Sequence, residues 1–287
     1  MMLTLHHVSK RLGGRAILHD IDLELTQGVT GLLAPNGAGK TTLLNMIATL
    51  LYPTEGSIQW NGEDIVAMDD RYRGLLGYLP QHFGYYPNYS PRRFLTYIAT
   101  LQAVRPSRID VRVDELLRLV GLTDVADKKM RTFSGGMIQR VGIAQALIHD
   151  PDLIILDEPT AGLDPKERVR FRNIIHELAA DRTVILSTHI VSDLSTIAGR
   201  IVMLKNGTVH ANSTPEDLIS ALRGHIYEMP AAMPLPPGQR LLSEVQYGTQ
   251  TRQRVWSPMP VDDAAVDGRV LTVQPNLEDV FLVTYGE

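Results

Sequence analysis

The sequence predicts an α/β protein that is built around a parallel β-sheet and binds its ligand at one edge of that sheet. Three short, mostly apolar segments, at 29–33, 153–156 and 184–186, predict strands that are buried on both faces. Each is followed within a few residues by side chains that can bind phosphate, a metal ion or a water molecule. Because ligands of open α/β sheets bind beyond the carboxyl ends of the strands, we expect these side chains to form one site.

The composition is that of a globular protein with a sizeable core. The chain has 287 residues, of which 44% are apolar and 21% charged, enough for one large domain or two unequal ones. A formal net charge of −4 argues against a nucleic-acid partner, and the absence of cysteine excludes disulfides and thiolate metal sites. No apolar run approaches the roughly 18 residues of a membrane span, and no signal-peptide pattern is present. We therefore expect a cytoplasmic chain that reaches a membrane only through a partner.

The first predicted strand leads into a loop typical of phosphate binding, "APNGAGKT" at 34–41. From Lys40 onward apolar residues recur at helical spacing up to Pro53, so the loop joins a strand to a helix. Successive N–H groups of such a loop can converge on phosphate oxygens, with Lys40 adding a charge and Thr41 a hydroxyl for Mg²⁺. The pattern has glycine where this chain has Ala34, but a residue that precedes proline is extended, which alanine tolerates. A glycine-rich turn that merely precedes a helix is the alternative.

Acidic residues and a histidine follow the other two predicted strands. Asp157 and Glu158 end the strand at 153–156, and adjacent strand residues point in opposite directions, so their roles should differ. We expect Asp157 to bind Mg²⁺ and Glu158 to act as the general base for a water molecule. His189 could contact the γ-phosphate or orient that water. Gln81, after a further strand-like segment, could reach the metal or the water.

The stretch "FSGGM" at 133–137 has no obvious role in a local turn. Ser-Gly-Gly costs backbone entropy, yet at the start of a helix it presents a hydroxyl, bare N–H groups and a positive helix end. From these residues alone two interpretations stay open: a flexible loop before an amphipathic helix, and a contact with an anion.

Taken together and in this order, the motifs resemble the nucleotide-binding subunit of an ATP-binding-cassette (ABC) transporter. The resemblance covers about residues 1–222. It rests on the loop at 34–42, Gln81, "FSGGM" at 133–137, "LIILDEP" at 153–159, "AGLDP" at 161–165 and His189.

The resemblance implies a P-loop NTPase cassette in the α/β class. Its parts would be a mixed-sheet core, an N-terminal antiparallel β-subdomain and a helical subdomain inserted at about 86–148. The implied function is ATP hydrolysis that drives a separate transmembrane permease, with ATP and Mg²⁺ as ligands. ATP would bring a second cassette onto the first, in a homodimer or alternatively a heterodimer, at the cytoplasmic face of the membrane.

The resemblance also implies roles for single residues. Those expected to bind phosphate are Asn36, Gly37, Ala38, Gly39, Lys40, Thr41 and Thr42. Those expected to complete the metal and water shell are Thr41, Gln81 and Asp157, beside the catalytic residues Glu158, His189 and Gln81. Residues expected at the other protomer's nucleotide or at the dimer seam are Ser134, Gly135, Gly136 and Asp164. Tyr85, Tyr86 and Tyr89 could line the groove for a permease helix, or could simply be packing.

One position departs from the family pattern. The family often stacks adenine on an aromatic side chain near the first strand, and the matching residue here is Leu12. Stacking of a base on a ring is worth about 1–3 kcal/mol. We therefore expect weaker nucleotide affinity and looser base selectivity than an aromatic residue would give.

Residues 223–287 predict a small α/β accessory domain without a catalytic cluster. From residue 225 on, four arginines and eight acidic residues give a net charge of −4, and four prolines fall between 230 and 237. Asn276 and Asp279 predict a capped helix after several short strands. The segment resembles extensions of drug, antibiotic or peptide exporters. It could stabilise the subunit pair, regulate closure, or only cover apolar surface.

Two other functions are compatible with an ATP-binding cassette. Soluble cassette ATPases of translation or DNA repair usually carry two cassettes, a coiled coil or a zinc insertion, and this chain has one cassette and no cysteine. A regulatory module that binds ATP without turnover would be expected to lack Glu158, His189 or Ser134, all of which are present.

Overall fold

The structure, a computed structural model, describes residues 1–261 and 269–286, whose contacts divide the chain into two units, Met1–Asn212 and Ser213–Glu287. Helix α9 (Pro215–Ser220) packs with the last helix of the second unit. The domain boundary expected from the sequence, after residue 222, would instead place α9 in the first unit.

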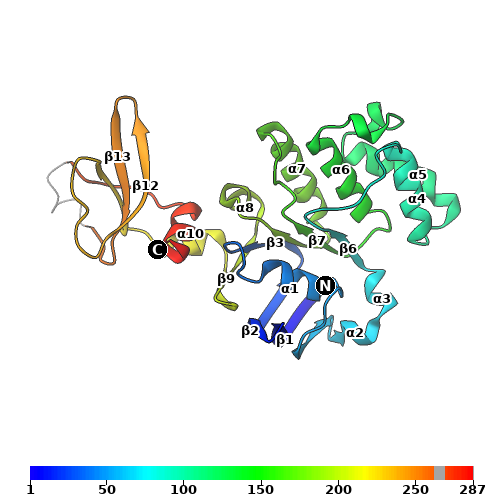
Figure 1. Cartoon of the computed structure of the whole chain (residues 1–287), viewed down its shortest axis with the longest axis horizontal. Helices are drawn as coiled ribbons and strands as arrows, with labels where there is room; N and C mark the ends of the chain where they lie inside the picture. The colour runs from blue at the N-terminus through cyan, green and yellow to red at the C-terminus, as the bar shows by residue number, and fades with distance from the viewer. Residues whose placement is uncertain (262–268, 287) are drawn as a thin grey trace. The chain divides into compact units, whose positions relative to one another are not determined.

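The core of the first unit is a six-stranded sheet in the order β10-β9-β3-β8-β7-β6. Its inner strands are parallel: β3 pairs with β8 and β9, and β7 pairs with β8 and β6. Figure 1 shows β3, β7 and β6 in the middle of this unit with helices around them. All residues of β7 and β8 are buried, which explains their continuous apolar sequence. The strands span β3 (Gly28–Leu33), β6 (Leu76–Leu79), β7 (Leu153–Asp157), β8 (Thr183–Ser187), β9 (Arg200–Lys205) and β10 (Thr208–Ser213).

Helices connect these strands and set the positions of the loops at their carboxyl ends. They are α1 (Lys40–Ile47), α7 (Pro165–Leu178) and α8 (Val191–Ile197). The prediction that the first helix continues to Pro53 was wrong, because α1 ends at Ile47. Thr49 has a φ of 58°, in the left-handed region that ends helices, and Leu50 is 61% exposed.

A second sheet of this unit is antiparallel, as the sequence led us to expect, with the order β2-β1-β4-β5. Alternate residues of β2, Ile21, Leu23 and Leu25, are buried, and the residues between them are exposed, as in a strand with one face on the core. The elements here are β1 (Met2–Leu12), β2 (Arg15–Thr26), β4 (Glu55–Trp60), β5 (Glu63–Asp64), α2 (Ile65–Met68) and α3 (Asp70–Arg73).

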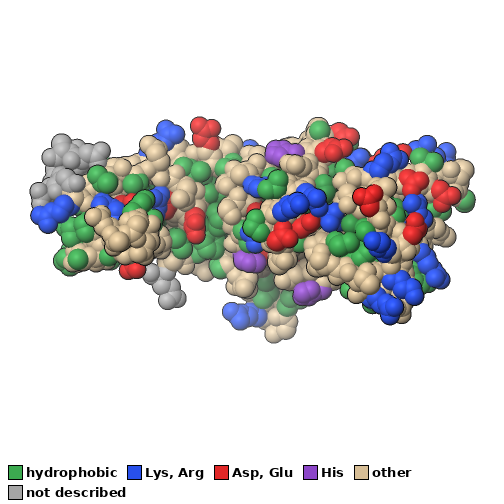
Figure 2. Space-filling view, turned by 90° about the horizontal axis from the view of Figure 1, so that it is seen from above, with side chains coloured by type: hydrophobic (Ala, Val, Ile, Leu, Met, Phe, Trp, Pro, Cys, Tyr) green, Lys and Arg blue, Asp and Glu red, His purple; other side chains and the backbone are tan. Residues whose placement is uncertain are grey.

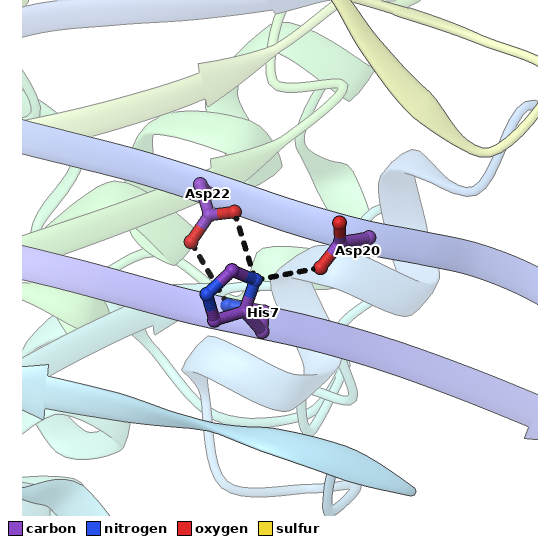
Figure 3. Close-up of side chains that lie close together, drawn as sticks. All are labelled: His7, Asp20 and Asp22. Atoms are coloured by element: carbon purple, nitrogen blue, oxygen red, sulfur yellow. Dashed lines mark hydrogen bonds and ion pairs between the residues drawn. The ribbon is translucent and has the colours of Figure 1, made fainter.

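Three charged side chains meet on the outer surface of this antiparallel sheet (Figure 3). The Nδ1 atom of His7 lies 2.8 Å from Asp20 Oδ1 and 3.3 Å from Asp22 Oδ2. A hydrogen bond to Asp20, together with the charge of Asp22, raises the pKa of His7. All three side chains are largely in water, where such groups pair without an ion, so we interpret the cluster as an exposed charge pairing.

The helical insertion follows β6, as the resemblance implies. Its helices are α4 (Pro91–Leu101), α5 (Pro106–Leu119) and α6 (Gly135–Ala146). Ser90 caps α4 by accepting from the Arg93 N–H, and Phe94, Val113 and Leu116 fill the core between the helices. The buried Arg140 of α6 donates to the carbonyl oxygens at the end of α5, which ties the insertion together.

In its described residues the second unit is a four-stranded antiparallel sheet with two helices, α9 and α10, which agrees with the predicted α/β extension. The strand order is β12-β13-β11-β14. The elements are β11 (Ile226–Pro230), β12 (Arg240–Tyr247), β13 (Gln250–Trp256), β14 (Leu271–Thr272) and α10 (Leu277–Tyr285). The last strand segment expected from the sequence spans 268–273; its first residue lies outside the described residues, and β14 lies within the rest of it. Asn276 and Asp279 form the predicted capping box at the start of α10.

A buried ion-pair network holds this second unit together. Arg254 of β13 donates to both carboxylate oxygens of Asp279 at 2.7 Å and to Glu228 at 3.1 Å. Only 3% of Glu228 and 2% of Asp279 is exposed. The network therefore joins strand β11, strand β13 and helix α10 through a single guanidinium group.

We expect Arg254→Met to destabilise this unit by about 3–5 kcal/mol, because the buried Asp279 carboxylate loses both bonds to the guanidinium and Glu228 is left with the longer ionic contact to Arg252, at 3.8 Å. Thermal unfolding followed by circular dichroism measures the effect, with Arg223→Met, at an exposed position of the same unit, as the control. An unchanged melting temperature for Arg254→Met would mean that water replaces the guanidinium at no cost.

Candidate nucleotide-binding site

A cleft of about 340 Å³ lies at the carboxyl ends of the parallel strands. It brings together ten of the residues singled out from the sequence and one that was missed, Ile17 of β2. The lining residues are Ile17, Asn36, Gly37, Gly39, Lys40, Thr41, Thr42, Gln81, Asp157, Glu158 and His189. Residues far apart in the chain thus converge as the predicted topology requires.

The loop between β3 and α1 has the geometry of an anion cradle. Gly37 and Gly39 have φ angles of 81° and 102°, which glycine adopts without strain. A side chain at Gly39 would also collide with Leu18, since a Cβ there lies 2.7 Å from its Cδ2. No side chain caps α1, so the N–H groups of its first turn are open to an anion. Ala38 does not line the cleft; its N–H donates to the Pro35 carbonyl across the loop.

Lys40 is buried at the base of this loop, with 7% of its surface exposed. Its ammonium donates to the carbonyl oxygens of Ala34, at 2.6 Å, and Pro35, at 3.2 Å. Burial lowers the pKa of Lys40, and the nearby carboxylates of Glu158 and Asp157 oppose that shift. As expected, Ala34 has no positive φ. A phosphate in the cradle would give this ammonium the anionic partner that it lacks.

The Thr41 hydroxyl and the Asp157 carboxylate face each other across the cleft. Thr41 Oγ1 lies 3.4 Å from Asp157 Oδ2. Together with Gln81, which also lines the cleft, they offer hydroxyl, carboxylate and amide oxygens, the hard ligands that Mg²⁺ takes alongside phosphate and water. The residues present therefore fit a magnesium ion.

Glu158 and His189 form a pair at the opening of the cleft. The His189 Nδ1 atom lies 2.8 Å from Glu158 Oε2, and the His189 backbone N–H donates to the same oxygen at 3.3 Å. The Glu158 side chain is 8% exposed and that of His189 is 55% exposed. Glu158 has a φ of 51°, a left-handed conformation that costs a non-glycine residue about 1–3 kcal/mol. This departure from the strand, which the sequence pattern does not indicate, turns the carboxylate toward His189.

Ser134, Gly135, Gly136 and Asp164 do not line the cleft of their own chain. Ser134 and Asp164 are instead the N-caps of α6 and α7, each accepting from a backbone N–H of its helix. A Cβ on Gly136 would lie 3.0 Å from Glu167, whereas a Cβ on Gly135 would meet no atom within 4 Å. Nothing in the chain's own fold thus requires glycine at 135.

Two other predictions concern aromatic contacts. Leu12, at the end of β1, is 41% exposed and is not among the cleft-lining residues, where Ile17 supplies the apolar wall. An apolar residue just after the β1–β2 turn was the signal available in the sequence for Ile17. On the helical insertion, Tyr86 lies 5.0 Å from Tyr89 and 5.8 Å from Tyr97, ring centre to ring centre. Tyr86 remains 48% exposed.

The surface of the chain carries charges of both signs. On the face seen in Figure 2, acidic and basic side chains are interspersed, in agreement with the small net charge. Within the part of the chain that the structure describes, no helix is both long enough and apolar enough to cross a bilayer.

Comparison with known proteins identifies the family of this chain. Residues 18–161 match the family model described as "ABC transporter". The uncharacterized ABC transporter ATP-binding protein YxlF of Bacillus subtilis is 38% identical over 69% of this chain. The match spans 65% of the length of YxlF. Two further relatives, each 33% identical over 99% of this chain, are the Nod factor export ATP-binding protein I of Cupriavidus metallidurans (97% covered) and the daunorubicin resistance ATP-binding protein DrrA3 of Streptomyces coeruleorubidus (96% covered).

A solved structure of an ATP-binding cassette has a similar fold. A dimeric ATP-binding cassette in a post-hydrolysis state, bound to ADP and phosphate, superposes with a TM-score of 0.66 and 27% identity. The match covers 74% of this chain and 98% of the other.

Proposed function

The chain belongs to the ABC transporter ATP-binding family, whose members are ATPases, and from that premise we propose that it powers a separate membrane-embedded permease. ATP binding closes two cassettes on each other, and hydrolysis releases them. The observation that carries the proposal is the Glu158–His189 pair at the mouth of a phosphate cradle, since a module that only stores ATP needs no base there.

In the proposed reaction, Glu158 accepts a proton from a water molecule while the water oxygen attacks the γ-phosphorus. The bond to the β-phosphate oxygen breaks, and ADP leaves with the electron pair. Lys40 and the N–H groups of the loop hold the phosphate oxygens, and His189 keeps the Glu158 carboxylate oriented. Mg²⁺, held by Thr41, Asp157 and Gln81, would neutralise phosphate charge.

The second half of each site comes from a second cassette. Ser134 and Gly135 begin a helix whose N–H groups suit an anion, yet they lie outside their own cleft. At Gly135 the space that a Cβ would occupy is open, which leaves room for a phosphate of the facing chain. Asp164, at the start of α7, would lie near the same seam. A homodimer is the simpler assembly, because this chain carries a full set of site residues.

The permease would dock on the helical insertion. Tyr86 and Tyr97 expose apolar rings beside Tyr89, over which the Arg93 guanidinium lies 4.0 Å from the ring centre. Such surfaces suit a short helix of a partner. One full-length relative is named for Nod factor export and the other for daunorubicin resistance, which supports export as the direction. The proposed substrate is a drug, a peptide or a lipid-like molecule, with the cassette on the cytoplasmic face of the membrane. A soluble ATPase of translation or DNA repair is the rival function.

The test is ATP-dependent dimerisation of Glu158→Gln, measured by light scattering. The amide cannot accept the water proton, so we expect a stable dimer with Mg-ATP in this variant, while the wild type returns to monomer as ATP is consumed. Glu158→Gln combined with Gly135→Glu is the matched control and should stay monomeric. A Glu158→Gln protein that stays monomeric although ATP is bound would contradict closure by this chain alone.

Leu12→Tyr should tighten ATP binding by about 1–2 kcal/mol, because the larger aromatic ring can stack on the base, whereas Leu12 is not among the cleft-lining residues. The ratio of ATP to GTP affinity should rise with it. Competition between the two nucleotides, measured by equilibrium binding to the wild type and to Leu12→Tyr, checks this. A wild type that already prefers ATP strongly would refute the loose base selectivity that we expect.

A further inference from the structure

A buried serine hydroxyl lies between the two acidic residues of the cleft. Ser187 is the last residue of β8, and none of its surface is exposed. The parallel pairing of β7 with β8 sets it opposite Asp157, and its Oγ donates a short hydrogen bond to Asp157 Oδ1. The Glu158 backbone N–H donates to the same Oγ, at 3.2 Å, and to the Ser187 carbonyl oxygen, at 3.0 Å.

The hydrogen bond to Asp157 determines which carboxylate oxygen faces the cleft. The terminal torsion of an aspartate is broad, so packing alone holds it poorly. With Oδ1 bonded to Ser187, Oδ2 is the oxygen that faces Thr41, at 3.4 Å. Only 2% of Asp157 is exposed, so water has little access to replace the lost donor if the hydroxyl is removed.

The contacts to Glu158 hold a strained backbone. Glu158 has a φ of 51°, and its N–H is bonded only to the hydroxyl and carbonyl oxygens of Ser187 among the described residues. This conformation directs the carboxylate to His189. The neighbouring hydroxyl, that of Thr188, contacts a different group, since its Oγ1 accepts from the Ile190 N–H.

We infer that Ser187 is a positioning residue of the ATPase site, whose single hydroxyl orients Asp157 toward the divalent cation and holds Glu158 in its left-handed turn. The inference rests on the proposed roles of Asp157 and Glu158. Partners of this kind, which orient a metal ligand without touching the metal, typically change metal affinity or activity by about 10–100-fold when they are removed.

The experiment measures how much Mg²⁺ tightens nucleotide binding. The affinity of the chain for the non-hydrolysable β,γ-imido analogue of ATP is determined with Mg²⁺ and with EDTA. In Ser187→Ala we expect the gain from Mg²⁺ to shrink by about 10–100-fold, with the affinity in EDTA unchanged. Ser187→Thr, which keeps a hydroxyl, should retain more of the gain than Ser187→Ala.

The matched control is Thr183→Val, at the other end of the same strand. Thr183 is also fully buried, and its Oγ1 has no hydrogen-bond partner among the described residues, so its removal tests the loss of a buried hydroxyl alone. If Mg²⁺ tightens nucleotide binding as much in Ser187→Ala as it does in the wild type, the inference is overturned and the proposed function still stands. A wild type without any gain from Mg²⁺ overturns the cation site itself, and the inference with it.

Discussion

Lys40→Met is expected to lose nucleotide binding while keeping, or slightly raising, the stability of the nucleotide-free chain. In the free chain the ammonium is buried and, among the described residues, hydrogen-bonded only to two backbone carbonyls, so the attraction of the nearby Glu158 and Asp157 carboxylates offsets only part of its lost solvation. Bound to phosphate, the same charge contributes about 2–3 kcal/mol. Methionine has a similar length and no charge, so Lys40→Met removes the contact with phosphate and also removes the cost of burying the charge.

Thermal melting with and without ATP measures both effects at once. The wild type should melt higher with ATP, by an amount that follows its affinity. Lys40→Met should melt at or above the wild type without ATP and show little or no increase with it. A nucleotide-dependent increase of wild-type size would contradict a phosphate contact by Lys40.

The pH dependence of the nucleotide-free chain tests the same burial. Burial lowers the pKa of Lys40 in the fold below its usual value of 10.5. Between the lowered pKa and 10.5 the unfolded chain binds more protons at this residue than the fold, so this residue makes stability rise with pH in that window. The difference in unfolding free energy between the wild type and Lys40→Met, followed by denaturant titration, should change with pH in this direction.

Gly135→Glu is expected to abolish turnover without weakening nucleotide binding by the isolated chain. Position 135 begins α6, where a negative side chain favours the helix, and open space surrounds its Cα. In the closed dimer the same carboxylate would meet the phosphates of the facing chain. Loss of such a donor site and its replacement by a like charge should lower the turnover number by on the order of 10²–10³-fold.

Hydrolysis rate and nucleotide affinity, measured separately on the same protein, decide this prediction. Gly135→Gln is the control, with the same size and no charge, and should lose less activity than Gly135→Glu. Full turnover in Gly135→Glu would refute the facing-chain role of residues 134–136, whatever the behaviour of the cleft.

Much of the fold could be predicted because its signals are local. The apolar strands at 153–156 and 184–186 are parallel neighbours in the sheet, and the capped helix at 277–285 begins at the predicted residue. The end of α1 could not be predicted, because Leu50 and Leu51 continue the helical spacing although the backbone turns at Thr49. The apolar periodicity of a segment predicts which face of a helix is buried. It does not predict where the helix ends, because that depends on the neighbouring elements.

By itself the sequence determined which residues make up the proposed site: a glycine-rich loop, two carboxylates and a histidine, each placed directly after a strand or at the start of a helix. Only the tertiary structure decided how these groups are held. It brings Ser187 between Asp157 and Glu158, turns Glu158 out of the strand, and leaves Gly135 away from its own cleft. These outcomes depend on which strands are neighbours in the sheet, and the residue pattern of one strand does not specify which strand pairs with it.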